Sequence, residues 1–245
     1  MVKYPPGGAR LYVILGSHAC RAGMLMLEHK GIEYRPVGLP TGFQAPLLRL
    51  RGYPGGTVPA LAMDGHRVQT NRAIARFLDE LVPRRPLLPQ DKRGEIEEAE
   101  RFADEVLQPT ARRLILAAGA RDLGSLVDYA DSGGLGPILA RRRGRRARIM
   151  RIAARHFFKI SDHTEACDLA ALPGVLDQID AWIRAGVLDG LEPNAADLQI
   201  APSICLLDYR HDIRAVVHGR PAWQLADRVI RDPAQQVAPE PVAVG

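Results

Sequence analysis

The sequence predicts an α/β thioredoxin-like domain followed by an all-α helical domain. Short apolar runs typical of strands alternate with helical patterns only in the first third of the chain. After residue 68 no strand-like alternation of useful length occurs, and apolar residues keep a helical period. A stretch with three prolines lies between the two patterns. We therefore expect a first domain over 1–82, a linker over 83–92, a helical domain over 93–231 and a tail over 232–245.

The first elements form a β-α-β unit. Residues 11–15 make an apolar run that predicts a buried strand. Ser17 is a typical N-cap for a helix that the glycine at position 31 ends. Residues 32–37 predict a second strand, parallel to the first because a helix connects the two.

The next elements complete the domain. Residues 40–54 are rich in glycine and proline, so we expect a loop with one helical turn. Residues 58–63 and 66–68 flank Asp64-Gly65, which predicts a hairpin. Asn71 is the expected cap of a helix with apolar residues at helical spacing: Ile74, Phe77, Leu78 and Leu81. The order β-α-β, loop, β-β-α is that of a thioredoxin domain.

The remaining pattern is helical. A long helix over 93–118 is expected to kink at Pro109, because proline cannot donate a backbone hydrogen bond. Further helices are expected over 141–160, 172–185, 195–208 and 221–230.

Composition points to a cytoplasmic protein. Cys20, Cys167 and Cys205 are widely spaced and odd in number, which suggests no disulfide framework. No secretory signal and no run of eighteen apolar residues occurs, so we expect no membrane partner. The formal net charge is +5, and almost all the basic residues are arginine. This preference for arginine over lysine is typical of a GC-rich genome. An arginine-rich run over 141–155 lacks interleaved aromatics, so we expect a solvated helix face rather than a nucleic-acid site.

Ser17 is the first candidate for chemistry. A hydroxyl at a helix N-terminus can donate a hydrogen bond to a bound thiolate, and the helix dipole favours the same negative charge. A free thiol has a pKa near 8.5, so lowering it by about two units requires about 2.7 kcal/mol. One charged hydrogen bond and a helix terminus can supply that. The alternative is that Ser17 is only a cap.

Cys20 is the second candidate. A thiol in the first turn of a helix is expected to have a lowered pKa and to be nucleophilic. The alternative is a small buried apolar side chain, the commonest fate of a free cysteine.

Four stretches resemble the glutathione S-transferase superfamily: 11–32, 54–61, 68–78 and 193–202. Counted back from Lys30-Gly31, Ser17 falls where the serine classes hold their catalytic hydroxyl and Cys20 at the second position of a redox motif. An alignment with a gap instead resembles the beta class, in which a cysteine forms a mixed disulfide with glutathione. The chain is also similar to actinobacterial proteins known only as transferase-like.

The resemblance implies a binding site for a thiol tripeptide. A cis proline, here Pro59, would turn the backbone of Val58 toward the peptide. We also expect His18 and Thr57 beside the ligand. Thr70 and Asn71 fall where the family holds the γ-glutamyl group, but Thr70 cannot supply a carboxylate to its ammonium. Asn194 and Asp197 would form a structural capping box, with no catalytic role.

These residues predict an enzyme that joins glutathione, or another low-molecular-weight thiol, to an electrophile. The resemblance implies a homodimer. No metal spacing, hydrolase elbow or dinucleotide motif occurs in the sequence, so we expect no metal. The alternatives are a redox enzyme that uses Cys20 and a binding module that has lost the chemistry. A nucleic-acid binder is a more distant alternative.

Overall fold

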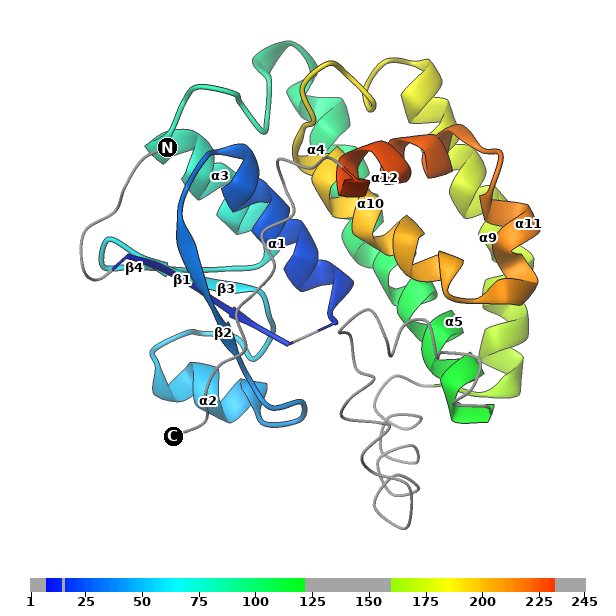
Figure 1. Cartoon of the computed structure of the whole chain (residues 1–245), viewed down its shortest axis with the longest axis horizontal. Helices are drawn as coiled ribbons and strands as arrows, with labels where there is room; N and C mark the ends of the chain where they lie inside the picture. The colour runs from blue at the N-terminus through cyan, green and yellow to red at the C-terminus, as the bar shows by residue number, and fades with distance from the viewer. Residues whose placement is uncertain (1–7, 15, 122–159, 232–245) are drawn as a thin grey trace.

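A four-stranded mixed sheet forms the centre of the first domain (Figure 1). The computed structural model describes residues 8–14, 16–121 and 160–231. The strands, β1 (Ala9–Val13), β2 (Tyr34–Gly38), β3 (Ala60–Met63) and β4 (His66–Gln69), lie in the order β2-β1-β3-β4. As predicted, β1 and β2 are parallel, and β3 and β4 form an antiparallel hairpin.

Three helices cover the two faces of this sheet. Side chains alternate along β1, so Leu11 and Val13 belong to the main core with α1 (His18–His29) and α3 (Asn71–Leu81). Tyr12 faces the other way and packs with Leu48 of α2 (Gln44–Leu50). The expected loop over 40–54 therefore contains a short helix, because the buried Leu48 fixes it on the sheet.

The second domain is entirely helical in the part that the structure describes. Residues 82–89 carry no helix or strand, and a 3-10 turn, η1 (Gln90–Lys92), follows them. The α-helices are α4 (Arg93–Phe102), α5 (Gln108–Arg121), α9 (Asp162–Arg184), α10 (Ala195–Asp208), α11 (Arg214–Val217) and α12 (Pro221–Arg231). A second 3-10 turn, η4 (His211–Ile213), precedes α11.

The predicted interruption at Pro109 takes the form of a π-helical turn. This segment, η2 (Ala103–Leu107), separates α4 from α5 just before the proline. A π turn widens the helix locally, which accommodates the ring and the missing donor of Pro109.

Two helix starts are capping boxes, and only one of them lies at the predicted position. The helix that we expected from residue 172 begins at Asp162, because Ser161 and Thr164 cap each other there. The start of α10 is the predicted one, with Asn194 as cap and Asp197 accepting from the Asn194 backbone N–H at 2.9 Å. The expected helix over 141–160, the arginine-rich run and the tail from 232 lie outside the described residues.

The two domains share one continuous core. It contains side chains from the first domain and from the helices α4, α5 and α10, among them Leu25, Leu114 and Ile200. Helix α1 lies between the sheet and α10 (Figure 1), so nearly all its side chains are buried. Among the described residues, no helix combines the length and apolar character needed to cross a bilayer.

Candidate active site

Ser17 caps the N-terminus of α1, as predicted. Its backbone is extended, and its hydroxyl oxygen accepts a long hydrogen bond from the Cys20 N–H at 3.4 Å. Because a hydroxyl can accept and donate at once, its proton remains to be donated to an anion. The side chain is half-buried, so solvent reaches this helix end.

Positive charge surrounds this helix end. The first N–H groups of α1 lie here, and they carry the positive end of the helix dipole. Arg112, a half-buried residue of α5, lies close enough to lower the pKa of both Cys20 and His18. No local pattern marks Arg112 as a site residue, because only the fold brings it near the start of α1.

Cys20 lies beneath this site, not in it. Its side chain is only 1% exposed, and burial raises the pKa of its thiol. Hydrogen bonds from Ser17 and from the Ile14 backbone act in the opposite direction but do not reverse the change. The expected lowering of the Cys20 pKa is therefore wrong, because its position in the first turn faces the core.

His18 also points away from the position that we expected. Its imidazole is buried, with Nδ1 2.9 Å from the Ser203 hydroxyl of α10. Burial, helped by the charge of Arg112, lowers the His18 pKa to about 3, so the ring is neutral. The contact joins the two domains directly below Ser17. Ser203 was not predicted, because no local pattern marks it.

The Val58–Pro59 peptide bond is cis, as the resemblance implied. Val58 is half-buried, and among the described residues its backbone N–H and C=O have no hydrogen-bond partner. These groups can therefore pair with an extended peptide as the edge of a sheet does. Thr57 is exposed beside them.

Gln69 holds the loop before the cis proline, a role that the sequence did not reveal. Its side chain accepts from the Gly55 N–H at 2.9 Å and donates to the Thr57 carbonyl at 2.7 Å. A β-carbon on Gly55 would lie 2.7 Å from Gln69 Oε1, so a larger residue there would displace the Gln69 amide from this position. In the structure Gln69 therefore supports the loop that leads to the cis proline.

Thr70 takes the cap role that we expected for Asn71, and Asn71 is buried against α1. Thr70 is the cap of α3, with a positive φ of 81° and a hydroxyl that accepts from the Ala73 N–H at 3.3 Å. Asn71 is the first residue of the helix and is buried, donating to the Ala19 carbonyl of α1 at 3.0 Å. The prediction that Asn71 caps the helix is therefore wrong, and only Thr70 is exposed at this end.

Three elements meet around the N-terminus of α1. The Thr70 N–H donates to the Pro59 carbonyl at 3.2 Å, and Asn71 binds α1. Gly23 of α1 approaches so closely that an added β-carbon would lie 3.2 Å from Pro59 Cγ. These contacts bring the Ser17, Val58 and Thr70 segments together around one helix end. Among the described residues, no group of three or more His, Cys, Asp or Glu side chains could hold a metal ion.

Comparison with known proteins gives the same picture. Residues 16–81 match the family model described as glutathione S-transferase, N-terminal domain. The Drosophila melanogaster protein named probable maleylacetoacetate isomerase 2 is 41% identical over 61 residues, which are 24% of this chain and 27% of that protein. The match thus spans only about a quarter of that relative.

Solved structures are similar over almost the whole chain. A glutathione S-transferase from Ceriporiopsis subvermispora, in complex with glutathione, is 16% identical with a TM-score of 0.65, covering 96% of this chain and 100% of that chain. One from Rhodospirillum rubrum is 22% identical with a TM-score of 0.64, covering 93% and 90%. Residues 16–81 are thus similar to the N-terminal domain of glutathione S-transferases, and the fold is similar to the two-domain fold of the solved glutathione S-transferases.

Proposed function

We propose that this protein is a glutathione transferase-like enzyme that joins a low-molecular-weight thiol to an electrophile. The observation that carries the proposal is the Ser17 hydroxyl at the start of α1, a helix whose Gly23 lies against Pro59 of the cis Val58–Pro59 bond. A thiol over that helix end meets a hydrogen-bond donor and a positive dipole together. The glutathione complex of a similar structure supports glutathione as the thiol.

In this mechanism the protein acts by stabilising a thiolate. The thiol loses its proton to solvent, and Ser17 then donates its hydroxyl proton in a hydrogen bond to the sulfur. The positive charge of Arg112, which acts on neighbouring Cys20, favours the same anion. The thiolate attacks the electrophile, and the rate gain comes from thiolate concentration and proximity.

The backbone of Val58 would hold the cysteinyl part of the thiol. Its N–H and C=O pair with the ligand backbone as a further strand would. Thr70 would lie at the far end of the thiol, where it is exposed and carries no carboxylate. Glutathione binding through its ammonium is therefore weakened, and an analogue with another group at that end is an equal candidate.

The relative named as an isomerase suggests a second reaction at the same site. A thiolate that adds to a conjugated double bond allows rotation about it, and then leaves again. That reaction needs the same Ser17 donor and consumes no thiol. Turnover without loss of free thiol would distinguish isomerisation from conjugation.

The redox alternative depends on Cys20, whose burial and raised pKa oppose attack on a disulfide. Activity that is lost in Cys20→Ser and kept in Ser17→Ala would support the redox alternative. A folded sample that binds no thiol by calorimetry would favour a binding module that lacks the chemistry. The homodimer and the cytoplasmic location implied by the resemblance are part of our proposal.

The experiment compares two serine caps. Ser161 caps α9, accepting from the Thr164 N–H at 3.1 Å, so Ser161→Ala is a matched control for Ser17→Ala. Each change removes a cap worth about 1 kcal/mol of stability. Thermal-shift titrations with glutathione and mycothiol identify the thiol, since a ligand of the native state raises the melting temperature.

Turnover of an activated aryl halide then measures the chemistry. We expect Ser17→Ala to lower kcat on the order of a hundredfold, as loss of one oriented donor to an anion does. Ser161→Ala should leave kcat unchanged. Equal kcat in wild type and Ser17→Ala would reject the proposed role of Ser17.

A further inference from the structure

A row of arginines crosses the sheet on the face that carries α2. The strand register places Arg35 of β2 beside Arg10 of β1, Arg10 beside Ala62 of β3, and Ala62 beside Arg67 of β4. Partners in register point to the same face of a sheet. Tyr12, two residues after Arg10, packs against α2, so this is the face that α2 partly covers.

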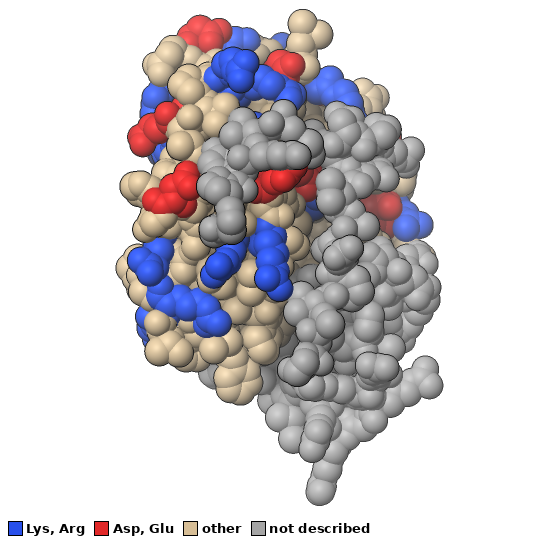
Figure 2. All heavy atoms as spheres, turned by 60° about the vertical axis from the view of Figure 1, so that its left-hand side comes forward, with Lys and Arg blue, Asp and Glu red and all other residues tan. Residues whose placement is uncertain are grey.

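Two further arginines, Arg49 and Arg51, stand at the C-terminal end of α2. Arg51 lies over the Tyr12 ring, with Cζ 5.5 Å from the ring centroid. Arg67 lies against Gly52, where an added β-carbon would be 3.4 Å from its Nε. We call the exposed set the arginine face: Arg10, Arg35, Arg49, Arg51 and Arg67. Figure 2 shows several basic side chains close together on the lower left of the described surface, and others at its top.

The arginine face has no counter-charge among the described residues. None of its five members lies within 4.0 Å of an acidic side chain there. Arginines elsewhere do have one: Arg113 binds Asp168, and Arg220 binds Asp177 and Asp180. Like charges on neighbouring strands destabilise a sheet. This arrangement therefore weakens the fold and leaves its positive potential for an external anion.

Helix α2 presents an apolar stripe beside the arginine face. Phe43 is 65% exposed and Leu50 is 83% exposed, and the two stand seven residues apart. Pro46 is exposed between them. Residues at i, i+3 and i+7 share one face of a helix, so the outer face of α2 is apolar. Arg49 and Arg51 flank this stripe.

We propose that the arginine face and the outer stripe of α2 dock together on an anionic lipid surface. Basic residues beside exposed Phe and Leu are the composition of interfacial helices, in which the apolar groups enter the headgroup boundary. Arginine side chains on the sheet act over the Debye length of about 8 Å, so they need not touch the lipid. Such contact is peripheral and needs no membrane-spanning segment. It is therefore compatible with a sequence that has no long apolar run.

The lipid surface is favoured over nucleic acid by the aromatic residues. Binding of single strands uses exposed rings as stacking platforms. Tyr12 and Tyr53, the rings nearest the arginine face, are 8% and 3% exposed, so neither offers such a platform. Phe43 lies beyond the sheet at the start of α2, next to apolar Pro46 and not among the arginines of the row.

The test is co-sedimentation of the full chain with vesicles. One vesicle type is phosphatidylcholine alone, and the other is phosphatidylcholine mixed with phosphatidylserine. The variants are R10Q/R35Q/R67Q, which removes the row, and F43Q/L50Q, which removes the stripe. The control R84Q/R101Q/R184Q removes the same charge from exposed arginines outside the face. Melting temperatures show that each variant folds.

We expect binding to the mixed vesicles only, and weaker binding as salt rises. The row variant should partition on the order of a hundredfold more weakly, given the usual contribution of each basic residue near an anionic surface. The stripe variant should also bind more weakly, and the control should bind as wild type does.

Three results would overturn the proposal. One is wild-type protein that ignores the mixed vesicles. Another is equal loss of binding in the control and row variants. The third is salt-sensitive binding to duplex DNA, lost in the row variant, by a protein that does not bind the vesicles. Thiol binding by the same variants is measured in parallel, so failure here is distinguishable from failure of the proposed enzyme.

Discussion

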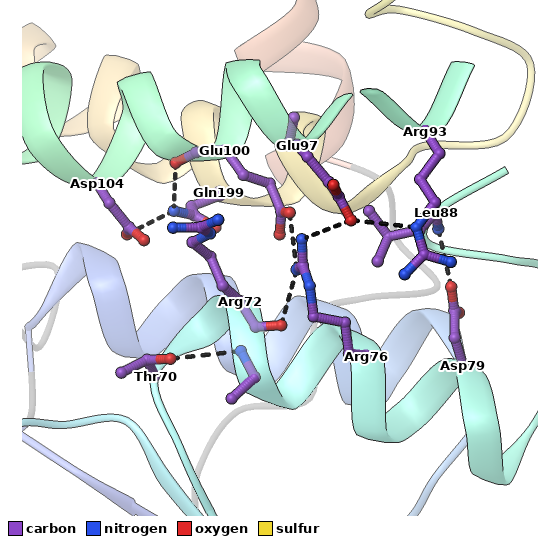
Figure 3. Close-up of polar contacts among 12 residues, drawn as sticks. Thr70, Arg72, Arg76, Asp79, Leu88, Arg93, Glu97, Glu100, Asp104 and Gln199 are labelled. Carbon is purple, nitrogen blue, oxygen red and sulfur yellow. Dashed lines mark hydrogen bonds and ion pairs between the residues drawn. The ribbon is translucent and has the colours of Figure 1, made fainter. Parts of the chain in front are cut away.

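Arg76 of α3 and Glu100 of α4 form an ion pair across the two domains, with Nη1 2.8 Å from Oε2 (Figure 3). The Glu100 carboxylate is completely buried, while Arg76 also reaches the more exposed Glu97 at 3.2 Å. Gln199 of α10 donates to the Glu100 backbone carbonyl and to Asp104. One buried acid thus lies where three helices from both domains meet.

This acid makes stability depend on pH. Burial raises the pKa of Glu100 to about 7, although Arg76 acts in the opposite direction. The folded state therefore binds a proton that the unfolded state has released above its pKa of about 4.5. The free energy of unfolding contributed by Glu100 falls as pH rises from about 4.5 to about 7, by at most about 3 kcal/mol. Asp104, with a pKa raised to about 6 mainly by burial, acts in the same direction.

Urea denaturation near pH 5 and near pH 8 measures this effect. Glu100→Gln cannot titrate, so its stability relative to wild type should rise with pH. Glu97→Gln is the matched control, because Glu97 contacts the same Arg76 at a half-buried position. A wild type and a Glu100→Gln variant with parallel pH profiles would contradict the raised pKa.

Gly23 should be essential for the thiol site. An alanine there would place its β-carbon 3.2 Å from Pro59 Cγ and 3.3 Å from Asn71 Oδ1, so α1 or the cis-proline segment must shift. We expect Gly23→Ala to cost about 1–3 kcal/mol, as overpacking does, and to weaken thiol binding. Calorimetry and urea denaturation measure the two effects.

Gly174→Ala is the control for this change. Gly174 lies within α9, and an added β-carbon there has no neighbour within 4 Å. Because alanine favours a helix over glycine, this variant should gain up to about 1 kcal/mol and bind thiol normally. If Gly23→Ala behaved as Gly174→Ala does, the close approach of α1 to Pro59 would not matter for binding.

Gln69 should act on binding through the loop that it holds. Gln69→Ala removes the bonds to Gly55 and Thr57, leaving the segment before Val58 without its two anchors. We expect a loss of about 1–2 kcal/mol in stability and a clear rise in the Kd for the thiol, with kcat little changed. Gln224→Ala, an exposed position on α12, should change neither quantity. A lower kcat with an unchanged Kd would place Gln69 in the chemistry instead.

Local signals were enough to predict much of this molecule. The Ser17 cap, the hairpin at Asp64-Gly65 and the Asn194–Asp197 capping box each depend on residues close in sequence, and each was found as predicted. The predictions that failed concern residues whose surroundings depend on packing between segments distant in sequence. Cys20 is buried by the helices around it, and Arg112 reaches α1 only through the fold.

The arginine face shows the same limit. Arg10, Arg35 and Arg67 are scattered along the sequence, and only the strand register makes them neighbours. Helix α2 was expected as a single turn, because glycine and proline on either side of it predict a loop. Nothing in that local pattern indicates that Leu48 is buried. Register and burial are tertiary properties, and no window of sequence contains them.

The pairing of His18 with Ser203 predicts a pH effect opposite to that of Glu100. The folded pKa of His18 is about 3, lowered mainly by burial, so the unfolded chain takes up a proton below about 6.5 that the folded chain does not. The stability contributed by neutral His18 is full above that pH and is lost as pH falls. His29, with a pKa lowered to about 4 mainly by burial, adds to the same loss.

His18→Asn should therefore flatten the acid side of the stability profile, measured by urea denaturation between about pH 4 and about pH 7. His163→Asn, at an exposed position on α9, is the control and should leave the slope unchanged. Ser203→Ala removes the partner of Nδ1 and should cost about 1–3 kcal/mol at neutral pH, because the buried nitrogen is left unpaired. If His18 serves only the contact between domains, thiol affinity stays the same in Ser203→Ala; a raised Kd would instead mean that the imidazole helps to orient the start of α1.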